Sequence, residues 1–191
     1  LAEASASIPG IYSVGLPYEI NGKLYNVAAA ISDGQVLGMV PKSYIPNYNE
    51  FYEVRHFTSG AELSVSVTLP DGSDVLLDRE QMFVCEQMPK LKIAVELCED
   101  LWTPNPPSIA HALSGADVIV NLSASNEITG KSAYRKELVC GQSARLISAY
   151  IYASAGEGES TQDLVFAGHN MIAENGRMLA ESERFGHGVI Y

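Results

Sequence analysis

The chain has 191 residues, 47% of them hydrophobic and 18% charged, a balance typical of one globular domain with a real core. Its formal net charge of −11 argues against the basic surface that nucleic acids and anionic membranes require. The three cysteines, Cys85, Cys98 and Cys140, have neither paired nor zinc-like spacing, and no apolar run is long enough to span a membrane. The sequence therefore predicts a cytoplasmic protein with reduced thiols and no metal site.

The N-terminal half is predicted to form antiparallel strands. Turn signals at Asn21-Gly22 and Ser32-Asp33-Gly34-Gln35 separate short apolar segments, which is typical of successive hairpins. Strands are expected over residues 10–17, 24–31 and 36–40, and on both sides of the turn at residues 70–73. Residues 43–57 are rich in aromatic and charged side chains, which favours a functional site or an interface. The alternative is a loop that packs over a sheet edge.

In the second half, strands alternate with helices, which predicts an α/β domain with a mixed sheet. Strands are expected over residues 91–97, 117–123, 151–155, 163–169 and 170–173, and helices over residues 108–113 and 131–150. Asn175-Gly176 predicts a further hairpin turn.

Cys98 is placed at the tip of a predicted strand. Apolar residues alternate from Leu91 to Leu97, which is the period of a half-buried strand, and the proline-rich residues 103–107 prevent simple continuation. A nucleophile can project into a cleft from such a strand-to-helix elbow, although an ordinary buried cysteine fits the local pattern equally well. Glu96, on the face opposite Leu97, is a candidate for a buried hydrogen-bonding strut.

Two segments resemble those of the nitrilase, or carbon–nitrogen hydrolase, superfamily. Residues 40–53 (VPKSYIPNYNEFYE) resemble its lysine segment, and residues 95–102 (VELCEDLW) resemble its cysteine elbow. The glutaminase domains of glutamine-dependent NAD⁺ synthetases are the most similar branch, on the strength of residues 99–102, 121–125, 163–176 and 179–185. The resemblance covers residues 10–186 and implies an α-β-β-α sandwich with mixed sheets that forms a homo-oligomer.

The resemblance also implies thiol chemistry on an amide, with L-glutamine as substrate and no cofactor for this step. Cys98 is expected to be the nucleophile, Lys42 the catalytic lysine beside it, and Glu50 an acid that orients the site. The backbone N–H of Glu99 would hold the oxyanion together with Lys42. Substrate contacts are implied for Tyr48, Glu99, Ser125 and Lys131. These residue types suit the chemistry, because an ammonium group favours the reactive thiolate and neutralises a tetrahedral oxyanion.

Two positions depart from the family pattern. Lys131 stands where the family often has arginine, so it would meet the substrate's α-carboxylate without a bidentate fork. The family's general-base glutamate normally lies farther upstream of the lysine than the 41 residues available here. Glu19 has similar surroundings but is expected to be a loop residue. We therefore expect the first strand and helix of the sandwich to be missing, so that residues 1–191 form a partial glutaminase domain with little activity alone.

The synthetase domain of such enzymes would bind ATP, magnesium and deamido-NAD⁺, and it is expected to be absent from this chain. The sequence contains no glycine cluster of the Ser-Gly-Gly type for the ATP pyrophosphate, and the acidic run Gly156-Glu157-Gly158-Glu159 would repel phosphate.

Three other functions fit parts of the sequence. A different amidase or carbamoylase of the superfamily would act on a small amide, but residues 99–102 argue against it. An inactive scaffold that contributes only oligomer contacts would follow from a missing base. A cysteine–histidine protease would draw on four histidines that lie in no recognisable signature: His56, His111, His169 and His187.

Overall fold

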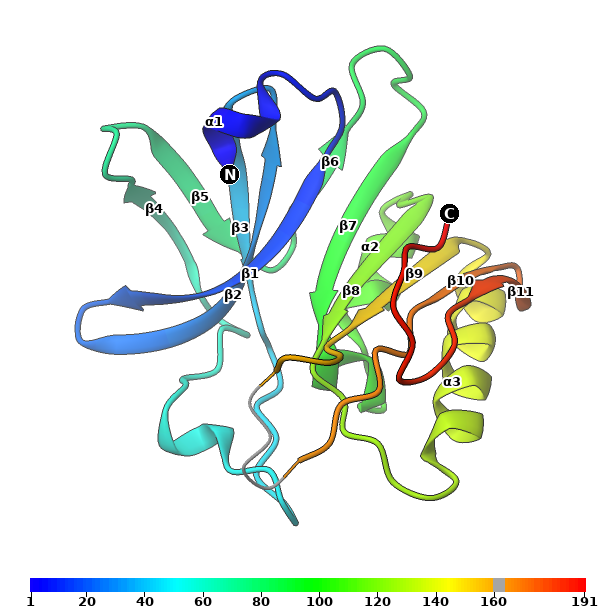
Figure 1. Ribbon diagram of the computed structural model, residues 1–191. Helices are drawn as coiled ribbons and strands as arrows, with labels where there is room; N and C mark the ends of the chain where they lie inside the picture. The colour runs from blue at the N-terminus through cyan, green and yellow to red at the C-terminus, as the bar shows by residue number, and fades with distance from the viewer. Residues whose placement is uncertain (160–163) are drawn as a thin grey trace.

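The computed structural model describes residues 1–159 and 164–191, and within them the strands form two sheets (Figure 1). Sheet A has the order β1-β2-β3-β5-β4, with β1 (Tyr12–Ile20), β2 (Lys23–Ser32), β3 (Gln35–Pro41), β4 (Ser64–Thr68) and β5 (Asp74–Asp78). Sheet B has the order β11-β10-β9-β8-β7-β6, with β6 (Met82–Val84), β7 (Lys92–Leu97), β8 (Val118–Ser123), β9 (Ala149–Ser154), β10 (Met171–Glu174) and β11 (Arg177–Glu181). The helical segments are α1 (Ala2–Ser5), η1 (Glu53–Arg55), η2 (Cys98–Trp102), α2 (Pro107–Leu113) and α3 (Lys131–Leu146).

The predicted hairpins of sheet A are confirmed. At the β1–β2 turn Asn21 and Gly22 have φ of 52° and 75°, the left-handed conformation that a type I′ turn needs at both central positions. Strand β1 is longer than predicted, because it continues through Pro17 to Ile20. It is an edge strand, where a residue without an N–H is tolerated. Glu19 is therefore an exposed strand residue, and its prediction as a loop residue was wrong.

Sheet B contains the predicted strand–helix alternation. Strands β7, β8 and β9 are parallel, and α2 and α3 connect them. Helix α3 ends at Leu146 rather than at residue 150, because Ile147 adopts a left-handed conformation with φ of 53°. Tyr150 instead pairs with Ile119 inside the sheet and is fully buried there.

The strand predicted over residues 163–169 is wrong for the part that the structure describes. Residues 164–170 form only an isolated bridge between Phe166 and Asn126, and Asp163 lies outside the described residues. The regular ladder begins at Met171, where β10 pairs with β9. The irregular backbone of residues 164–170 therefore packs beside the loop that follows β8.

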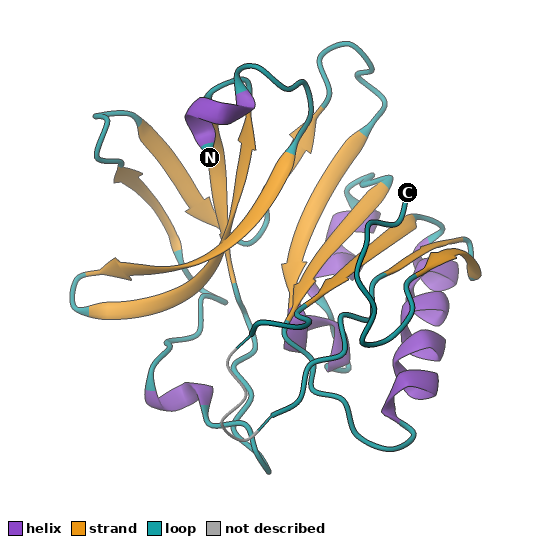
Figure 2. Ribbon diagram, viewed as in Figure 1, coloured by secondary structure: helices purple, strands orange, loops and turns teal. Residues whose placement is uncertain are grey.

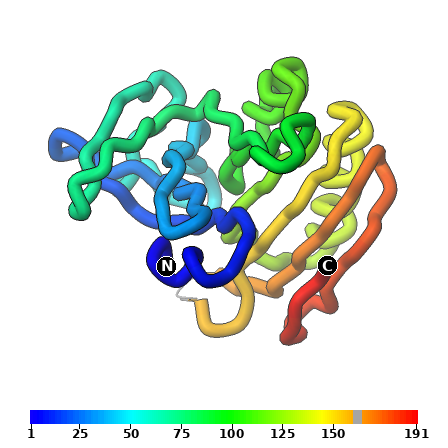
Figure 3. Tube along the Cα trace, turned by 90° about the horizontal axis from the view of Figure 1, so that it is seen from above, coloured from blue at the N-terminus to red at the C-terminus, as the bar shows by residue number. Residues whose placement is uncertain are grey.

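The two sheets pack face to face, and α2 and α3 cover the other face of sheet B (Figures 2 and 3). The core between the sheets consists of Ala28, Ala30, Val40, Phe83, Val95 and Leu97. A second core lies between sheet B and its helices and includes Ile119, Val139, Tyr150, Tyr152 and Met171. Loops that follow β3, β7 and β8 gather at the lower end of the molecule in Figure 1. None of the helices in the described residues is long and apolar enough to cross a membrane.

One side chain stabilises the join between the two halves of sheet A. Strands β3 and β5 are parallel and share the single ladder pair Met39–Leu77. The Gln81 amide nitrogen lies 2.6 Å from the Met39 carbonyl oxygen, and 3.0 and 3.1 Å from those of Asp78 and Leu76. Gly38 leaves the space for this amide, because a Cβ there would lie 2.1 Å from the Gln81 Oε1.

We predict that Gln81→Ala lowers the free energy of unfolding by about 1–3 kcal/mol, because it removes the donor to the carbonyl of the buried Met39 and to those of Leu76 and Asp78. Urea denaturation would measure the change. Gln35→Ala, at an exposed position of β3, is the matched control and should change stability by less than about 0.5 kcal/mol. Equal losses of unfolding free energy in the two variants would contradict this role of Gln81 in joining β3 to β5.

Candidate active site

Cys98 begins η2 at the carboxyl end of β7, as the sequence predicts. Its φ is +47°, a left-handed conformation that is uncommon for a residue with a Cβ. Such backbone strain costs about 1–3 kcal/mol and is concentrated at functional sites, including the nucleophile elbows of hydrolases. The Cys98 side chain is half-buried, and its backbone N–H donates to Asn121 Oδ1 at 3.1 Å.

A buried hydrogen-bonded chain supports this elbow from below. Asn121 Nδ2 donates to Tyr150 Oη at 3.1 Å, and Tyr150 Oη donates to Glu96 Oε1. Glu96 Oε2 in turn accepts the backbone N–H of Ser108 at 2.9 Å. Burial raises the pKa of both Glu96 and Tyr150. Glu96 is therefore the hydrogen-bonding strut that the sequence suggested, and it fixes the amide that holds Cys98.

Asp100 connects the elbow to the lysine segment. Its carboxylate is 1% exposed and accepts three backbone N–H groups, from Ser43 at 3.1 Å, Tyr44 at 2.8 Å and Leu97 at 3.0 Å. Burial raises the pKa of Asp100 to about 7. These bonds fix the backbone that follows Lys42 against the turn that carries Cys98.

Lys42 is 1% exposed, and its Nζ donates to Glu53 Oε2 at 2.7 Å. Burial disfavours the ammonium form, but the negative charges of Cys98 and Glu53 outweigh it, so that the pKa of Lys42 lies above its ordinary value. The carboxylate that contacts Lys42 is Glu53, whereas Glu50 was predicted only as an acid that orients the site. Glu50 instead accepts a hydrogen bond from Asn126 Nδ2.

A pocket of about 530 Å³ opens beside Cys98. Six of the seven residues predicted for the site line it: Tyr48, Glu50, Cys98, Glu99, Ser125 and Lys131. The seventh, Lys42, is buried behind Cys98 and acts on it electrostatically. The remaining lining residues are Asn49, Phe51, Trp102, Ile128, Thr129, Gly130 and Tyr134.

The polar groups of the pocket are held in place by their neighbours. Tyr48 Oη donates to Glu99 Oε1 at 2.9 Å, and burial raises the pKa of both side chains. The Lys131 ammonium lies 5.2 Å from the Trp102 ring centroid and 5.5 Å from that of Phe51. Burial, followed by the charge of Arg135, lowers the pKa of Lys131.

Ser125 also lines the pocket and is 4% exposed. Its hydroxyl lies beside that of Tyr152. Together with the thiol, the Lys131 ammonium and the Glu99 carboxylate, it suits a small molecule that carries charges of both signs and a reactive carbonyl. Within residues 1–159 and 164–191, no group of His, Cys, Asp and Glu side chains is arranged to hold a metal ion.

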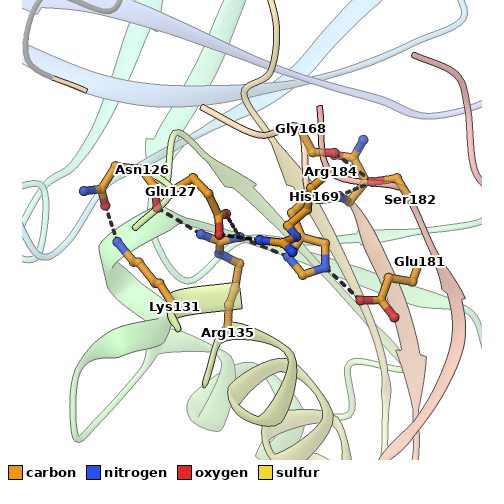
Figure 4. A network of polar contacts seen from close by, with 10 residues as sticks. Asn126, Glu127, Lys131, Arg135, Gly168, His169, Glu181, Ser182 and Arg184 are labelled. Atoms are coloured by element: carbon orange, nitrogen blue, oxygen red, sulfur yellow. Dashed lines mark hydrogen bonds and ion pairs between the residues drawn. The ribbon is translucent and has the colours of Figure 1, made fainter. Parts of the chain in front are cut away.

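The wall of the pocket between Ser125 and Lys131 rests on a buried polar network (Figure 4). Arg135 is fully buried and donates to the Asn126 carbonyl oxygen at 3.0 Å and to Glu127 Oε2 at 3.1 Å. It also donates to His169 Nδ1 at 3.0 Å. Helix α3 thus fixes the loop that follows β8.

Sequence reasoning missed Glu53, Asp100, Asn121 and Asn126. Asp100 carried a local signal, because an acid at the third position of a helical turn often accepts the N–H that precedes the turn. The other three had no such signal. Asn121 and Asn126 contact residues of distant segments, and Glu53 reaches Lys42 only through the fold of the loop that carries both.

The sequence model of the carbon–nitrogen hydrolase family matches residues 5–191, so the chain belongs to this family. A carbon–nitrogen hydrolase from Helicobacter pylori G27 has the same fold, with a TM-score of 0.77 at 18% identity over 96% of this chain and 61% of that one. The nitrilase-like sandwich with mixed sheets is therefore confirmed.

Within the family the chain is similar to glutamine-dependent NAD(+) synthetases. The Mycobacterium tuberculosis protein of that name is 44% identical over 189 residues, which cover 99% of this chain and 28% of the relative. The structure of a synthetase from Cytophaga hutchinsonii has a TM-score of 0.82 at 28% identity, over 96% of this chain and 29% of that one. The chain thus spans less than a third of the length of these relatives.

We predict that Asp100→Asn lowers the free energy of unfolding by about 1–3 kcal/mol, because an amide cannot accept all three N–H groups. The difference in the free energy of unfolding between the variant and the wild type should become smaller from about pH 4 to about pH 7. In that range Asp100 of the folded wild type keeps a proton that the unfolded chain has lost, since the pKa of Asp100 is about 7 in the folded state and 3.8 ordinarily. Wild-type stability therefore falls as pH rises. Urea denaturation across this range is the test, and a difference that widens with pH would contradict it.

Proposed function

We propose that this chain is the glutaminase part of a glutamine-dependent NAD⁺ synthetase and that Cys98 attacks the side-chain amide of L-glutamine. The observation that carries the proposal is a pocket that contains the Cys98 thiol and a cation, Lys131, with a second, buried ammonium, Lys42, close enough for the charge of Cys98 to raise its pKa. The similarity to synthetases from Mycobacterium tuberculosis and Cytophaga hutchinsonii supports it.

The proposed reaction begins with the Cys98 thiolate, which forms a C–S bond to the amide carbon while the carbonyl electron pair moves onto oxygen. The oxyanion is stabilised by Lys42 and by the backbone N–H of Glu99. When the intermediate collapses, the C–N bond breaks and ammonia leaves with a proton, which the family supplies through its glutamate. Water then hydrolyses the thioester to glutamate and restores the thiol.

The pocket provides groups for both ends of the amino acid. Lys131 is proposed to bind the α-carboxylate, and the Glu99 carboxylate, oriented by Tyr48, the α-ammonium. Ser125, which lines the pocket together with Lys131, is proposed to hydrogen-bond the bound substrate. Glu50 shapes this wall through Asn126.

In the longer protein, ammonia would pass to a synthetase domain that uses ATP and magnesium to amidate deamido-NAD⁺. L-glutamine and that domain are the proposed partners, and we expect a homo-oligomer, as the family implies. All three cysteines are free, which favours a cytoplasmic location.

We expect the full-length protein to release ammonia from L-glutamine and not from simple aliphatic amides such as propionamide. Cys98→Ala should lower the rate by more than about 10³-fold, because the nucleophile is lost. Cys140→Ala, in α3 and outside the pocket lining, is the control and should keep wild-type activity. Release from propionamide alone would assign a different amidase, and full activity in Cys98→Ala would remove the thiol mechanism.

A further inference from the structure

Asn126 lies between two opposite charges of the pocket. Its Nδ2 donates to Glu50 Oε1, and its Oδ1 accepts a hydrogen bond from Lys131 Nζ. The side chain is 3% exposed, whereas both of its partners line the pocket. The orientation of the amide is fixed, because a carboxylate can only accept and an ammonium can only donate.

The backbone of Asn126 is also fixed. Its carbonyl oxygen accepts Arg135 Nη2 at 3.0 Å, and its backbone forms a bridge with Phe166. Arginine has only donors, so the Nδ1 of His169 must accept the Arg135 hydrogen, and the ring proton lies on Nε2. That Nε2–H donates to Glu181 Oε1 at 2.9 Å (Figure 4). The backbone of Asn126 therefore cannot move out of the wall without breaking a buried network.

This arrangement determines how Lys131 can be used. Two ring faces and the Asn126 oxygen hold its ammonium. Glu50 and Glu99 act on this charge from a distance, but no carboxylate of the described residues forms an ion pair with it. If the amide were removed, Glu50 would be the nearest carboxylate on the same wall. A direct ion pair between Glu50 and Lys131 would then compete with the carboxylate of a ligand.

We infer that Asn126 is a positioning residue whose amide keeps Glu50 and Lys131 apart and so leaves the Lys131 ammonium available for the substrate's carboxylate. The inference rests on the proposed function, because it deepens the account of how that pocket selects an amino acid rather than a plain amide.

The test compares two alkylating probes of Cys98 in the full-length protein, measured by mass spectrometry. One is a chloroketone analogue of glutamine that keeps the α-amino and α-carboxylate groups, and the other is iodoacetamide, which has neither. In both reactions the thiolate forms a C–S bond and a halide leaves. Asn126→Ala should raise the half-saturating chloroketone concentration about 10- to 100-fold, the loss expected for a charge-assisted hydrogen bond. The rate with iodoacetamide should stay within about twofold.

Asn126→Asp is the second variant, and it keeps the shape of the side chain. Its carboxylate would pair with Lys131 directly and should raise the half-saturating concentration at least as much. Asn170→Ala is the matched control: this amide accepts the Ser154 N–H at 2.8 Å outside the pocket lining, so chloroketone binding should be unchanged.

Three results would overturn the inference while the proposed function stands. They are wild-type half-saturation in both Asn126 variants, an equal slowing with iodoacetamide, and the failure of both variants to fold, which would make Asn126 a purely structural residue. Labelling of the wild type without saturation by the chloroketone would instead remove the glutamine assignment, and the inference with it.

Discussion

The carboxylate of Asp100 is the constraint on which the site depends. Lys42 directly follows β3 of sheet A, and Cys98 directly follows β7 of sheet B, so that each lies just beyond the end of a strand. Asp100 accepts the N–H groups of Ser43 and Tyr44 from one segment and that of Leu97 from the other. A buried carboxylate is costly unless several donors satisfy it, so the bonds to both segments must form together. The fold therefore specifies the meeting of thiol and ammonium through one side chain that contacts neither.

The charged groups around the pocket follow the same rule of paired burial. Lys42 is compensated by Glu53, and Glu99 is hydrogen-bonded by Tyr48. Lys131 differs, because a neutral amide and two aromatic rings hold it rather than a carboxylate. The carboxylate of a ligand could therefore form the ion pair that Lys131 lacks in the protein. The wall that carries Lys131 is held by the fully buried Arg135, which donates to the Asn126 carbonyl oxygen.

Much of the fold could be predicted because its signals are local. Asn-Gly and Asp-Gly pairs define hairpin turns through their tolerance of positive φ, and apolar alternation defines β7. The end of α3 could not be predicted, because the sequence Ile147-Ser148-Ala149-Tyr150 suits a helix as well as a strand. Tyr150 pairs with Ile119 in the sheet, and this pairing determines that the helix ends before residue 147. Pro17 was expected to end a strand, and only the edge position of β1 explains why it does not.

In the site, too, some features could be predicted from the sequence and others depend on the fold. Six of the residues predicted from the family resemblance line one pocket. The partner of Lys42 depends on how one loop folds back on itself, and the role of Asn126 depends on a contact with the distant Glu50. Glu50 and Glu53 are both acids in one loop, and sequence spacing does not tell which of them turns toward Lys42. In the structure Asn126 holds Glu50, and Glu53 pairs with Lys42.

The most direct measurement of the central claim, that Lys42 activates Cys98, is the rate of iodoacetamide labelling at each cysteine, followed by mass spectrometry at neutral pH. Cys85 and Cys140 are half-buried like Cys98 and serve as references in the same molecule. The account predicts that Cys98 reacts at least about tenfold faster than either, since a nearby ammonium favours the thiolate. Lys42→Met should remove this advantage, and Lys42→Arg should keep most of it. An unchanged Cys98 rate in folded Lys42→Met would contradict the account.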